Sequence, residues 1–333
     1  MKNKATIIFI ILVLCGIQGC TYMDAINVIK IDEAKIRARL KSIQAFIVGD
    51  GRHYIYEAAI FKKTEAWELA KAVKAQNVRK IKRILNKNPE LIDYQDPEYG
   101  VTLLIWSIGT ERYKSAKALL EMGASVNIRN VYGETALFVA SGYSWVDYQA
   151  KKDPKYAKLL LEYGADPNIC SLGNPTGKTY HGNARYEPEP YISPLMQSIP
   201  CGIEKTKLLV EGGADVNYRT PLGCTATEEA LGMGGRGGGP EYAYYLIVEK
   251  KAIVTEPYRH KVDGRELYLI EYLRSPQWTY PLDSEGYRIK MEIVEEFARQ
   301  GVDYWANQYI PPFALELVKK DYPNDWEEYI KKF

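Results

Sequence analysis

A string of nine or ten residues recurs along the 333-residue chain and constrains the fold more than any other feature. Each of the three clear copies holds two adjacent leucines, then a glycine and an alanine, and ends on an asparagine. The copies are Leu119–Asn127, Leu160–Asn168 and Leu208–Asn217, with weaker ones at Leu246–Val254 and Ile293–Asp303. A fixed internal repeat indicates small units that bury their apolar faces against one another, rather than one central core.

A helix start recurs between these strings. Gly100 and Gly133 lie 33 residues apart, and Thr102 and Thr135 follow them at the same spacing. A threonine or serine hydroxyl caps a helix start, and proline suits the first turn, as in Ser193-Pro194. The pattern predicts a short first helix in each unit, with an inward leucine on it: Leu104, Leu137 and Leu195.

The paired leucines predict a second helix, which the glycine of each string would end in the left-handed conformation. Those glycines are Gly123, Gly164 and Gly213, and Lys251 stands in this place in a weaker copy. The Asp and Asn residues after them are typical of turns that begin a hairpin.

Together these strings resemble ankyrin repeats over residues 65 to 320. The resemblance implies an all-α repeat solenoid of about six units with degenerate ends, each a helix-turn-helix with a β-hairpin loop. The usual Thr-Pro-Leu-His phrase is never complete. Ile105, Phe138, Met196 and Glu228 stand where His is expected.

The repeat period divides the chain. We expect a tether and N-terminal packing segment over 20–64, the array over 65–306 and a C-terminal cap over 307–333. Insertions break the array near 143–154, 170–190, 232–240 and 274–287, and the glycine-rich stretch 232–240 is expected to be its loosest part. Two alternatives stand for 21–64: a helix with Ile36, Leu40, Ile43 and Ile47 on one face, or a hairpin turning at Asp50-Gly51.

Residues 1–19 are typical of a signal peptide, because Lys2 and Lys4 precede an apolar run over 5–17. As a helix that run reaches only ~20 Å, short of the ~30 Å hydrocarbon core. Its end, Ile17-Gln18-Gly19-Cys20, resembles the lipobox of bacterial lipoproteins. The resemblance implies lipidation at Cys20, and Thr21 after it implies the outer membrane, facing the periplasm. The alternatives are a plain secretory signal, or an unlipidated form starting at Met23.

Charge and composition favour a binding protein. The chain has 44 Lys+Arg and 42 Asp+Glu, and the removal of Lys2 and Lys4 with the leader leaves it formally neutral. General nucleic-acid binding is therefore disfavoured. The chain contains 27 Tyr against 7 Phe, and tyrosine suits contact surfaces that also meet water.

The ankyrin resemblance implies that hairpin tips and first helices bind a protein partner. The predicted partner-binding residues are Tyr99, Arg129, Tyr132, Tyr218 and Arg219 at the tips, and Tyr180, His181, Arg185, Tyr186 and Tyr191 in the long loop. Tyr and Arg are enriched in interface cores. The alternative is that the tyrosines only pad the hairpins.

No catalytic, cofactor or metal site is predicted. Gly232-x-Gly234-x-x-Gly237 matches a dinucleotide fingerprint only formally, because a helix and not a strand precedes it. His53, His181 and His260 lack metal-ligand spacing, and the pairs Glu228-Glu229 and Glu295-Glu296 are interpreted as solvated helix faces. Cys170, Cys201 and Cys224 are too far apart in the repeat register for a disulfide.

The leading hypothesis is a lipid-anchored envelope protein, monomeric apart from its partner, that binds and occludes one protein. The combination of lipobox and ankyrin array resembles immunity proteins against type VI-secreted phospholipase effectors. The alternative is a scaffold for several envelope proteins or a stress-tolerance protein. A third hypothesis, an enzyme using the glycine loop, predicts nucleotide-dependent thermal stabilisation.

Overall fold

The computed structural model describes residues 55–146, 153–173, 190–199, 201–232, 239–259, 265–306 and 312–331. The chain divides into residues 1–53 and residues 54–333, and only the second unit contains described residues. The predicted leader, the lipidation site Cys20 and residues 20–54 of the predicted tether and packing segment therefore lie outside the described residues.

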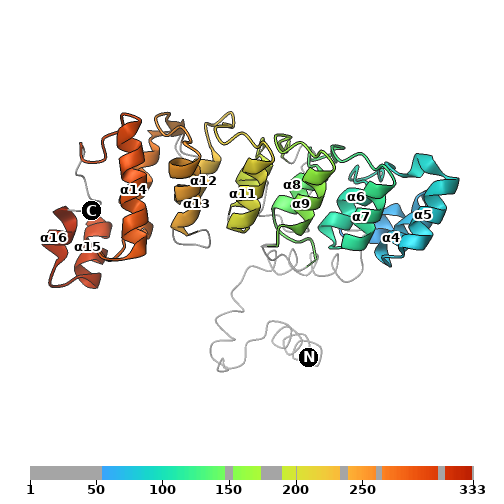
Figure 1. Cartoon of the computed structure of the whole chain (residues 1–333), viewed down its shortest axis with the longest axis horizontal. Coiled ribbons are helices and arrows are strands. Elements are labelled where there is room, and N and C mark those ends of the chain that lie inside the picture. The colour runs from blue at the N-terminus through green and yellow to red at the C-terminus, as the bar shows by residue number, and fades with distance from the viewer. Residues whose placement is uncertain are drawn as a thin grey trace, which may run out of the picture. The chain divides into compact units, whose positions relative to one another are not determined.

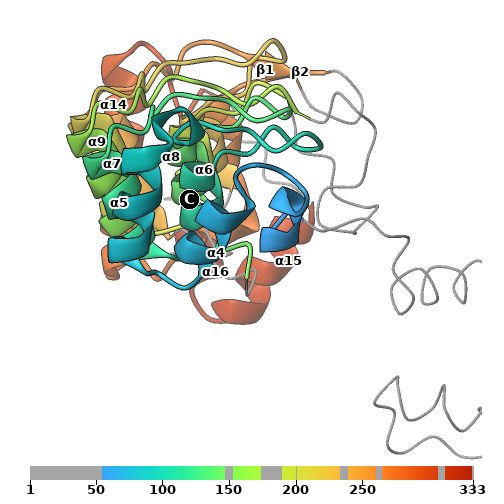
Figure 2. The ribbon, with the colours of Figure 1, turned by 90° about the vertical axis from the view of Figure 1, so that its right-hand side faces the viewer.

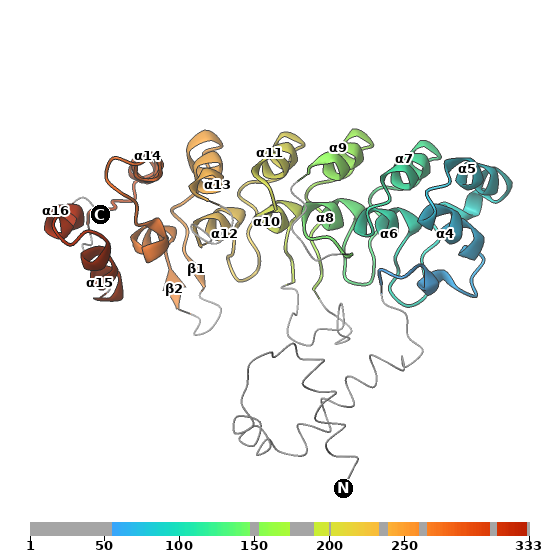
Figure 3. The same cartoon turned by 90° about the horizontal axis from the view of Figure 1, so that it is seen from below.

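The helices within residues 54–333 stand in consecutive antiparallel pairs, and each pair is called a unit of the array below (Figure 1). The first helices form one row and the second helices another, with the connecting loops projecting beside the first row (Figure 3). The pairs are α4 (Trp67–Lys74) with α5 (Val78–Lys87), α6 (Leu103–Gly109) with α7 (Tyr113–Glu121), α8 (Ala136–Ser141) with α9 (Lys155–Glu162), α10 (Pro194–Ser198) with α11 (Ile203–Glu211), and α12 (Ala226–Gly232) with α13 (Pro240–Tyr244).

The last unit departs from this regular form. In the unit before it, the second helix α13 continues directly into a π-helix, η4 (Tyr245–Glu249). The first helix of the last unit is the 3-10 helix η5 (Leu269–Arg274), followed by η6 (Pro276–Trp278), and its second helix is α14 (Glu285–Arg299). A short antiparallel sheet of β1 (Tyr258–Arg259) and β2 (Glu266–Leu267) precedes η5.

The predicted helix starts are confirmed. The hydroxyls of Thr102, Thr135 and Ser193 each accept a hydrogen bond from the backbone N–H three residues later, at 3.1–3.2 Å. The inward leucines of the three first helices, Leu104, Leu137 and Leu195, are at most 1% exposed. Capping and the buried leucine thus fix where each first helix begins and which way it faces.

The predicted helix ends are confirmed as well. Gly123, Gly164 and Gly213 have φ of +93°, +82° and +94°. The backbone N–H after each glycine donates to the carbonyl five residues before it, as Ala124 does to Leu119 and Ala165 does to Leu160, at 3.0 Å. Only glycine adopts this conformation without strain, which explains why it closes each copy of the recurring string.

A continuous apolar core runs through the array from residue 55 to residue 304. Ile55, Ala58 and Phe61, around the short 3-10 helix η1 (Ala58–Phe61), are buried in it together with α4. Trp278, expected within an insertion, is fully buried, and its indole N–H donates to the carbonyl of Leu231 at 2.8 Å. The stretch 274–287 therefore supplies part of the core of the last unit.

Two helices follow the last unit, α15 (Pro312–Asp321) and α16 (Trp326–Lys331), with their own small cluster around Val318 and Tyr329. Tyr329 attaches them to the array: its hydroxyl donates to the carbonyl of Tyr280 at 2.7 Å and accepts from the N–H of Tyr280 at 2.9 Å. Among the helices that the structure describes, none combines the length and apolarity needed to cross a bilayer.

The prediction that Glu228 and Glu296 lie on solvated helix faces was wrong. Glu228 is 7% exposed and accepts a hydrogen bond from the Tyr272 hydroxyl at 3.1 Å. Glu296 is 4% exposed and binds Lys251 at 2.7 Å. Both carboxylates lie at contacts between successive units. Each binds a residue of the neighbouring unit, 44 positions away in sequence for Glu228 and 45 positions away for Glu296. The predicted loose stretch after Gly232 lies, for residues 233–238, outside the described residues.

Candidate protein-binding surface

Neighbouring hairpins are joined by a ladder of side-chain amides. Asn168 accepts from the N–H of Asp215 at 2.8 Å and donates to the carbonyl of Gly213 at 2.9 Å, in the next unit. The Asn127 and Asn217 amides, and the carboxylate of Asp93 in the first unit, accept equivalent N–H bonds from the units that follow them, at 2.8–2.9 Å. The asparagine of the recurring string therefore sets the spacing between hairpins, in addition to its predicted role in the turn.

The hairpin tips also bind one another through the backbone. The N–H of Val131 donates to the carbonyl of Tyr99 at 2.9 Å, and that of Leu172 donates to the carbonyl of Tyr132 at 2.7 Å. Adjacent tips are thus held in register, and a surface built across them is largely preorganised before any partner arrives.

The described residues on the two sides of the long insertion are bonded to each other. Ser171 donates its N–H to the carbonyl of Ile192 at 3.0 Å, and Tyr191 donates its own to the carbonyl of Ser171 at 2.8 Å. The Tyr218 hydroxyl of the next hairpin donates to the carbonyl of Tyr191 at 2.9 Å. Both backbone groups of Tyr191 are therefore fixed.

Tyr191 has a strained backbone. Its φ is +66°, and in the other hairpins the corresponding place before the helix start is occupied by Gly100, Gly133 and Gly223, all with positive φ. A bulky residue in this conformation costs roughly 1–2 kcal/mol, and such strain often marks functional positions.

Three large apolar side chains are exposed at neighbouring tips: Leu172 at 47%, Tyr191 at 44% and Leu222 at 45%. The exposed Arg129 lies in the preceding hairpin, and the exposed Arg219 lies in the same hairpin as Leu222, where its guanidinium donates to the carbonyl of Pro257. We call these five residues the hairpin-tip surface. Leu172 and Leu222 were missed from sequence, because no local signal distinguishes an exposed leucine at a tip from a buried one.

Other predicted partner-binding residues fare differently. Tyr99 and Tyr218 are half-buried, and Tyr218 is engaged by Tyr191. Tyr132, predicted to be exposed, is only 1% exposed. The neighbouring hairpin contacts its backbone: the N–H of Leu172 donates to the Tyr132 carbonyl, and a Cβ built on Gly133 would lie 2.5 Å from the Leu172 Cγ. Tyr180, His181, Arg185 and Tyr186 lie outside the described residues.

The titratable groups near this surface are structural. Burial raises the pKa of Asp96. Its carboxylate accepts backbone N–H bonds from Tyr99, Val101 and Glu98 at 2.6–3.0 Å, and these bonds lower the pKa by less than burial raises it. Burial also raises the pKa of the Cys170 thiol above its ordinary value. Cys170 is therefore protonated at neutral pH and a poor nucleophile. It is a free thiol, as are Cys201 and Cys224.

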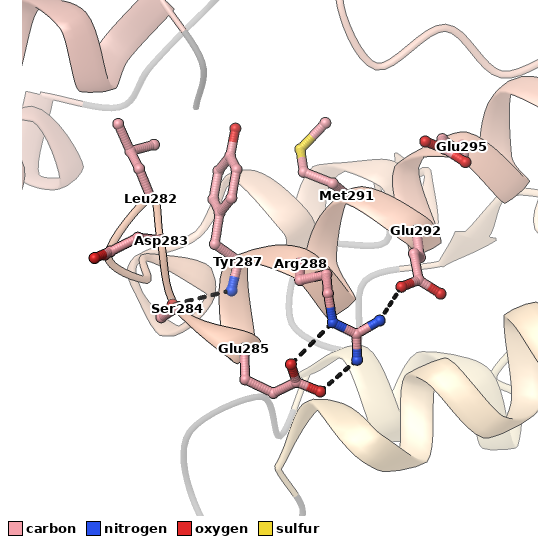
Figure 4. Close-up of a pocket in the computed structure, with 9 residues that line it drawn as sticks. All are labelled: Leu282, Asp283, Ser284, Glu285, Tyr287, Arg288, Met291, Glu292 and Glu295. Carbon is pink, nitrogen blue, oxygen red and sulfur yellow. Dashed lines mark hydrogen bonds and ion pairs between the residues drawn. The ribbon is translucent and has the colours of Figure 1, made fainter.

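A second candidate region is an open groove of about 390 Å³ along α14, lined by Leu282, Asp283, Ser284, Glu285, Tyr287, Arg288, Met291, Glu292 and Glu295 (Figure 4). The Arg288 guanidinium binds the carboxylates of Glu285 and Glu292. The bond from Arg288 lowers the pKa of Glu285, so the pair stays ionised and self-paired. Within the described ranges, no cluster of three or more His, Cys, Asp or Glu is placed to hold a metal.

Residues 69–171 match the family model described as ankyrin repeats, three copies. The chain also matches a solved protein, EF0377, titled an ankyrin repeat protein. The two are 20% identical with a TM-score of 0.47, and the match covers 71% of this chain and 99% of that one. The described residues form a mostly helical repeat solenoid, and its part from residue 69 to residue 171 matches ankyrin repeats.

Proposed function

We propose that this protein binds one protein partner through its hairpin-tip surface. The reason is that ankyrin repeats typically serve as non-catalytic modules for protein–protein binding. The observation that carries the proposal is the exposure of Leu172, Tyr191 and Leu222 on two adjacent hairpins, which the Tyr218 hydroxyl and the Asn168 side chain join by hydrogen bonds.

The chemistry of the surface fits a binding hot spot. A central apolar and aromatic cluster provides the area whose burial drives association, while flanking arginines supply hydrogen bonds at the rim. Because the ladder and the Tyr218–Tyr191 bond fix the tips, little conformational entropy is lost on binding. The strain at Tyr191 is consistent with a side chain held outward for contact rather than packed for stability.

We further propose that the protein is a lipoprotein, acylated at Cys20 and held at the periplasmic face of the outer membrane. The support is the sequence Ile17-Gln18-Gly19-Cys20 behind a basic and apolar leader. In the sharpest form of the proposal the partner is a secreted lipase effector, and the protein is its immunity protein. Tethering would concentrate the inhibitor at the surface that the lipase attacks.

Affinity capture from detergent-solubilised envelopes tests the binding surface. The variant Leu172→Ser/Leu222→Ser is compared with Tyr163→Ser/Trp305→Ser, which removes two exposed aromatic side chains elsewhere, 40% and 41% exposed. We expect the first variant to lose roughly a hundredfold in affinity for the captured partner, since each hot-spot side chain contributes about 1–2 kcal/mol. Equal capture by both variants would contradict the proposal.

The captured material also separates inhibition from scaffolding. One dominant partner with lipase activity, which the protein inhibits, supports the immunity role. Several resident envelope proteins support the alternative, a multi-partner scaffold. Protection of cells from the lipase, lost in Leu172→Ser/Leu222→Ser, is the decisive physiological readout for the immunity role.

A further inference from the structure

The second helices of the array carry an uneven distribution of charge. α5 contains five cationic residues and no acidic one: Arg79, Lys80, Lys82, Arg83 and Lys87. The sequence neutrality of the whole chain hides this local excess, because acidic residues concentrate on the second helices at the other end of the array.

Two of these five cations are neutralised by neighbouring helices. Lys80 binds Glu68 of α4 at 3.3 Å, and Lys82 binds Glu121 of α7 at 2.7 Å. The other three, Arg79, Arg83 and Lys87, are exposed and form no ion pair with any residue that the structure describes.

Arg79, Arg83 and Lys87 form one stripe. Their spacing of four residues places them along a single face of α5, opposite the fully buried Ile81 and Leu85. The exposed Lys114 and Lys117 of α7, the next second helix, extend the positive area. We call Arg79, Arg83, Lys87, Lys114 and Lys117 the basic face.

The second helices further along the array do not continue it. On α11, Lys207 lies 3.8 Å from Glu204, and Glu211 is exposed. The segment from α13 to η4 carries Glu241 and Glu249 without a cation. On α9, Lys155 binds Asp153 at 2.7 Å, and the exposed Lys158 is accompanied by the exposed Glu162. Among the second helices that the structure describes, a row of three unpaired cations without an acidic residue is therefore found on α5.

The basic face points away from the hairpins. In Figure 2 the second helices α5, α7 and α9 lie on one side of the array, and the loops and β1–β2 project from the other. A surface bound by α5 therefore leaves the hairpin-tip surface free for a protein partner.

We infer that the basic face docks on an anionic phospholipid surface. Each basic side chain near such a surface contributes about 1 kcal/mol, so the three unpaired residues of α5 suffice for a real preference. The large exposed apolar residues of the described chain all lie at residue 143 or beyond, so the basic face lacks the apolar anchors of a protein interface. It also lacks exposed aromatics for stacking single-stranded nucleic acid. The acidic far end would be repelled by the same surface, so the array would meet it with its first units.

Vesicle binding tests this inference independently of the partner. The full chain carrying Cys20→Ser, so that no acyl chain contributes, is titrated with phosphatidylcholine vesicles and with vesicles that also contain phosphatidylglycerol. The variant Arg79→Gln/Arg83→Gln/Lys87→Gln is compared with Lys319→Gln/Lys320→Gln/Lys331→Gln, which removes the same charge from α15 and α16. Circular dichroism and thermal midpoints confirm that both variants fold.

We expect binding only when phosphatidylglycerol is present, weakening with salt, and roughly a hundredfold loss in the α5 variant against little change in the control. Equal binding to both kinds of vesicle, or an unaltered α5 variant, would overturn the inference. Binding of duplex DNA that depends on the same three residues, without a phosphatidylglycerol preference, would also overturn it. None of these outcomes bears on the hairpin-tip surface, which affinity capture tests separately.

Discussion

The middle units and the last unit end their second helices with different residues at the same place. Gly164 and Gly213 have φ of +82° and +94°, and a Cβ built on either meets no atom within 4 Å. Lys251 occupies this place before the last unit with φ of +57°, and its amine binds the buried carboxylate of Glu296 at 2.7 Å. The open space that glycine leaves is thus large enough for a long side chain, whose ion pair offsets backbone strain.

The first helices show the same contrast. Ile105, Phe138 and Met196 are apolar and buried at one position, where the fifth unit has Glu228. The Tyr272 hydroxyl satisfies one oxygen of Glu228, while the other makes no hydrogen bond within the described residues. Local apolar packing holds the middle units together, whereas the C-terminal units depend on tyrosines, tryptophan and charges that reach across from the following unit.

The largest expected effect comes from Trp278→Ala. Removing a fully buried indole costs about 3–5 kcal/mol. Because contacts in a repeat array are local, we expect an early urea transition, followed by circular dichroism, that covers the last unit and its cap. Trp106→Ala, in the second unit, costs as much but gives no separate C-terminal transition. Identical unfolding curves for the two variants would remove the distinction between the regions.

Lys290→Met sharpens the comparison through pH. Burial, with the Arg274 charge second, lowers the pKa of Lys290 from 10.5 to about 7 in the folded chain. In the unfolded chain Lys290 keeps its proton up to about pH 10. Below pH 7 the folded chain must also bury the charged amine, which lowers the free energy of unfolding. Between about pH 7 and pH 10 only the unfolded chain is protonated there, so the free energy of unfolding rises with pH. We expect the substitution to stabilise by about 1–4 kcal/mol at pH 6 and by much less at pH 10.

Thermal unfolding at the two pH values checks this, with Lys158→Met as the control because Lys158 is exposed in the middle of the array. A gain that does not depend on pH would show that packing, and not the buried charge, limits the stability of the last unit.

A smaller effect is expected for the amide ladder. Asn168→Ala removes two exposed hydrogen bonds to the next unit and should cost about 1 kcal/mol. Gln300 makes the corresponding pair in the last unit, with the N–H of Val254 at 3.1 Å and the carbonyl of Ala252 at 3.0 Å. Gln300→Ala should therefore cost a similar amount in denaturant titrations. An unchanged midpoint for either variant would show that its amide contributes no stability.

The smallest effect is expected at Lys251. Lys251→Gly relieves backbone strain but loses the half-exposed ion pair, so its net change should stay within about 0.5 kcal/mol. Lys251→Ala keeps the strain and loses the pair, and should cost about 1 kcal/mol. A glycine variant less stable than the alanine variant in chemical denaturation would refute this explanation of the helix end.

Sequence signals that act within a few residues predicted most of the regular fold. The cap at Thr135 acts on the N–H of Phe138, and Gly164 ends its own helix. The signals failed where a distant residue decides. The N–H of Leu172, from the next hairpin, donates to the carbonyl of the buried Tyr132, and the hydroxyl of Tyr272, 44 residues away, donates to the buried Glu228. Whether a side chain at a hairpin tip is exposed likewise depends on the neighbouring tip. The sequence around Leu222 therefore could not predict that this leucine is exposed.

Site-specific photocrosslinking in cells tests the central claim most directly. A photoreactive residue at Leu222, 45% exposed on the hairpin-tip surface, is compared with one at Tyr163, 40% exposed at the end of α9. The proposed function predicts one strong crosslinked protein from position 222 and none from position 163. Crosslinking of that protein from position 163 alone would place the partner away from the hairpin-tip surface and contradict the account.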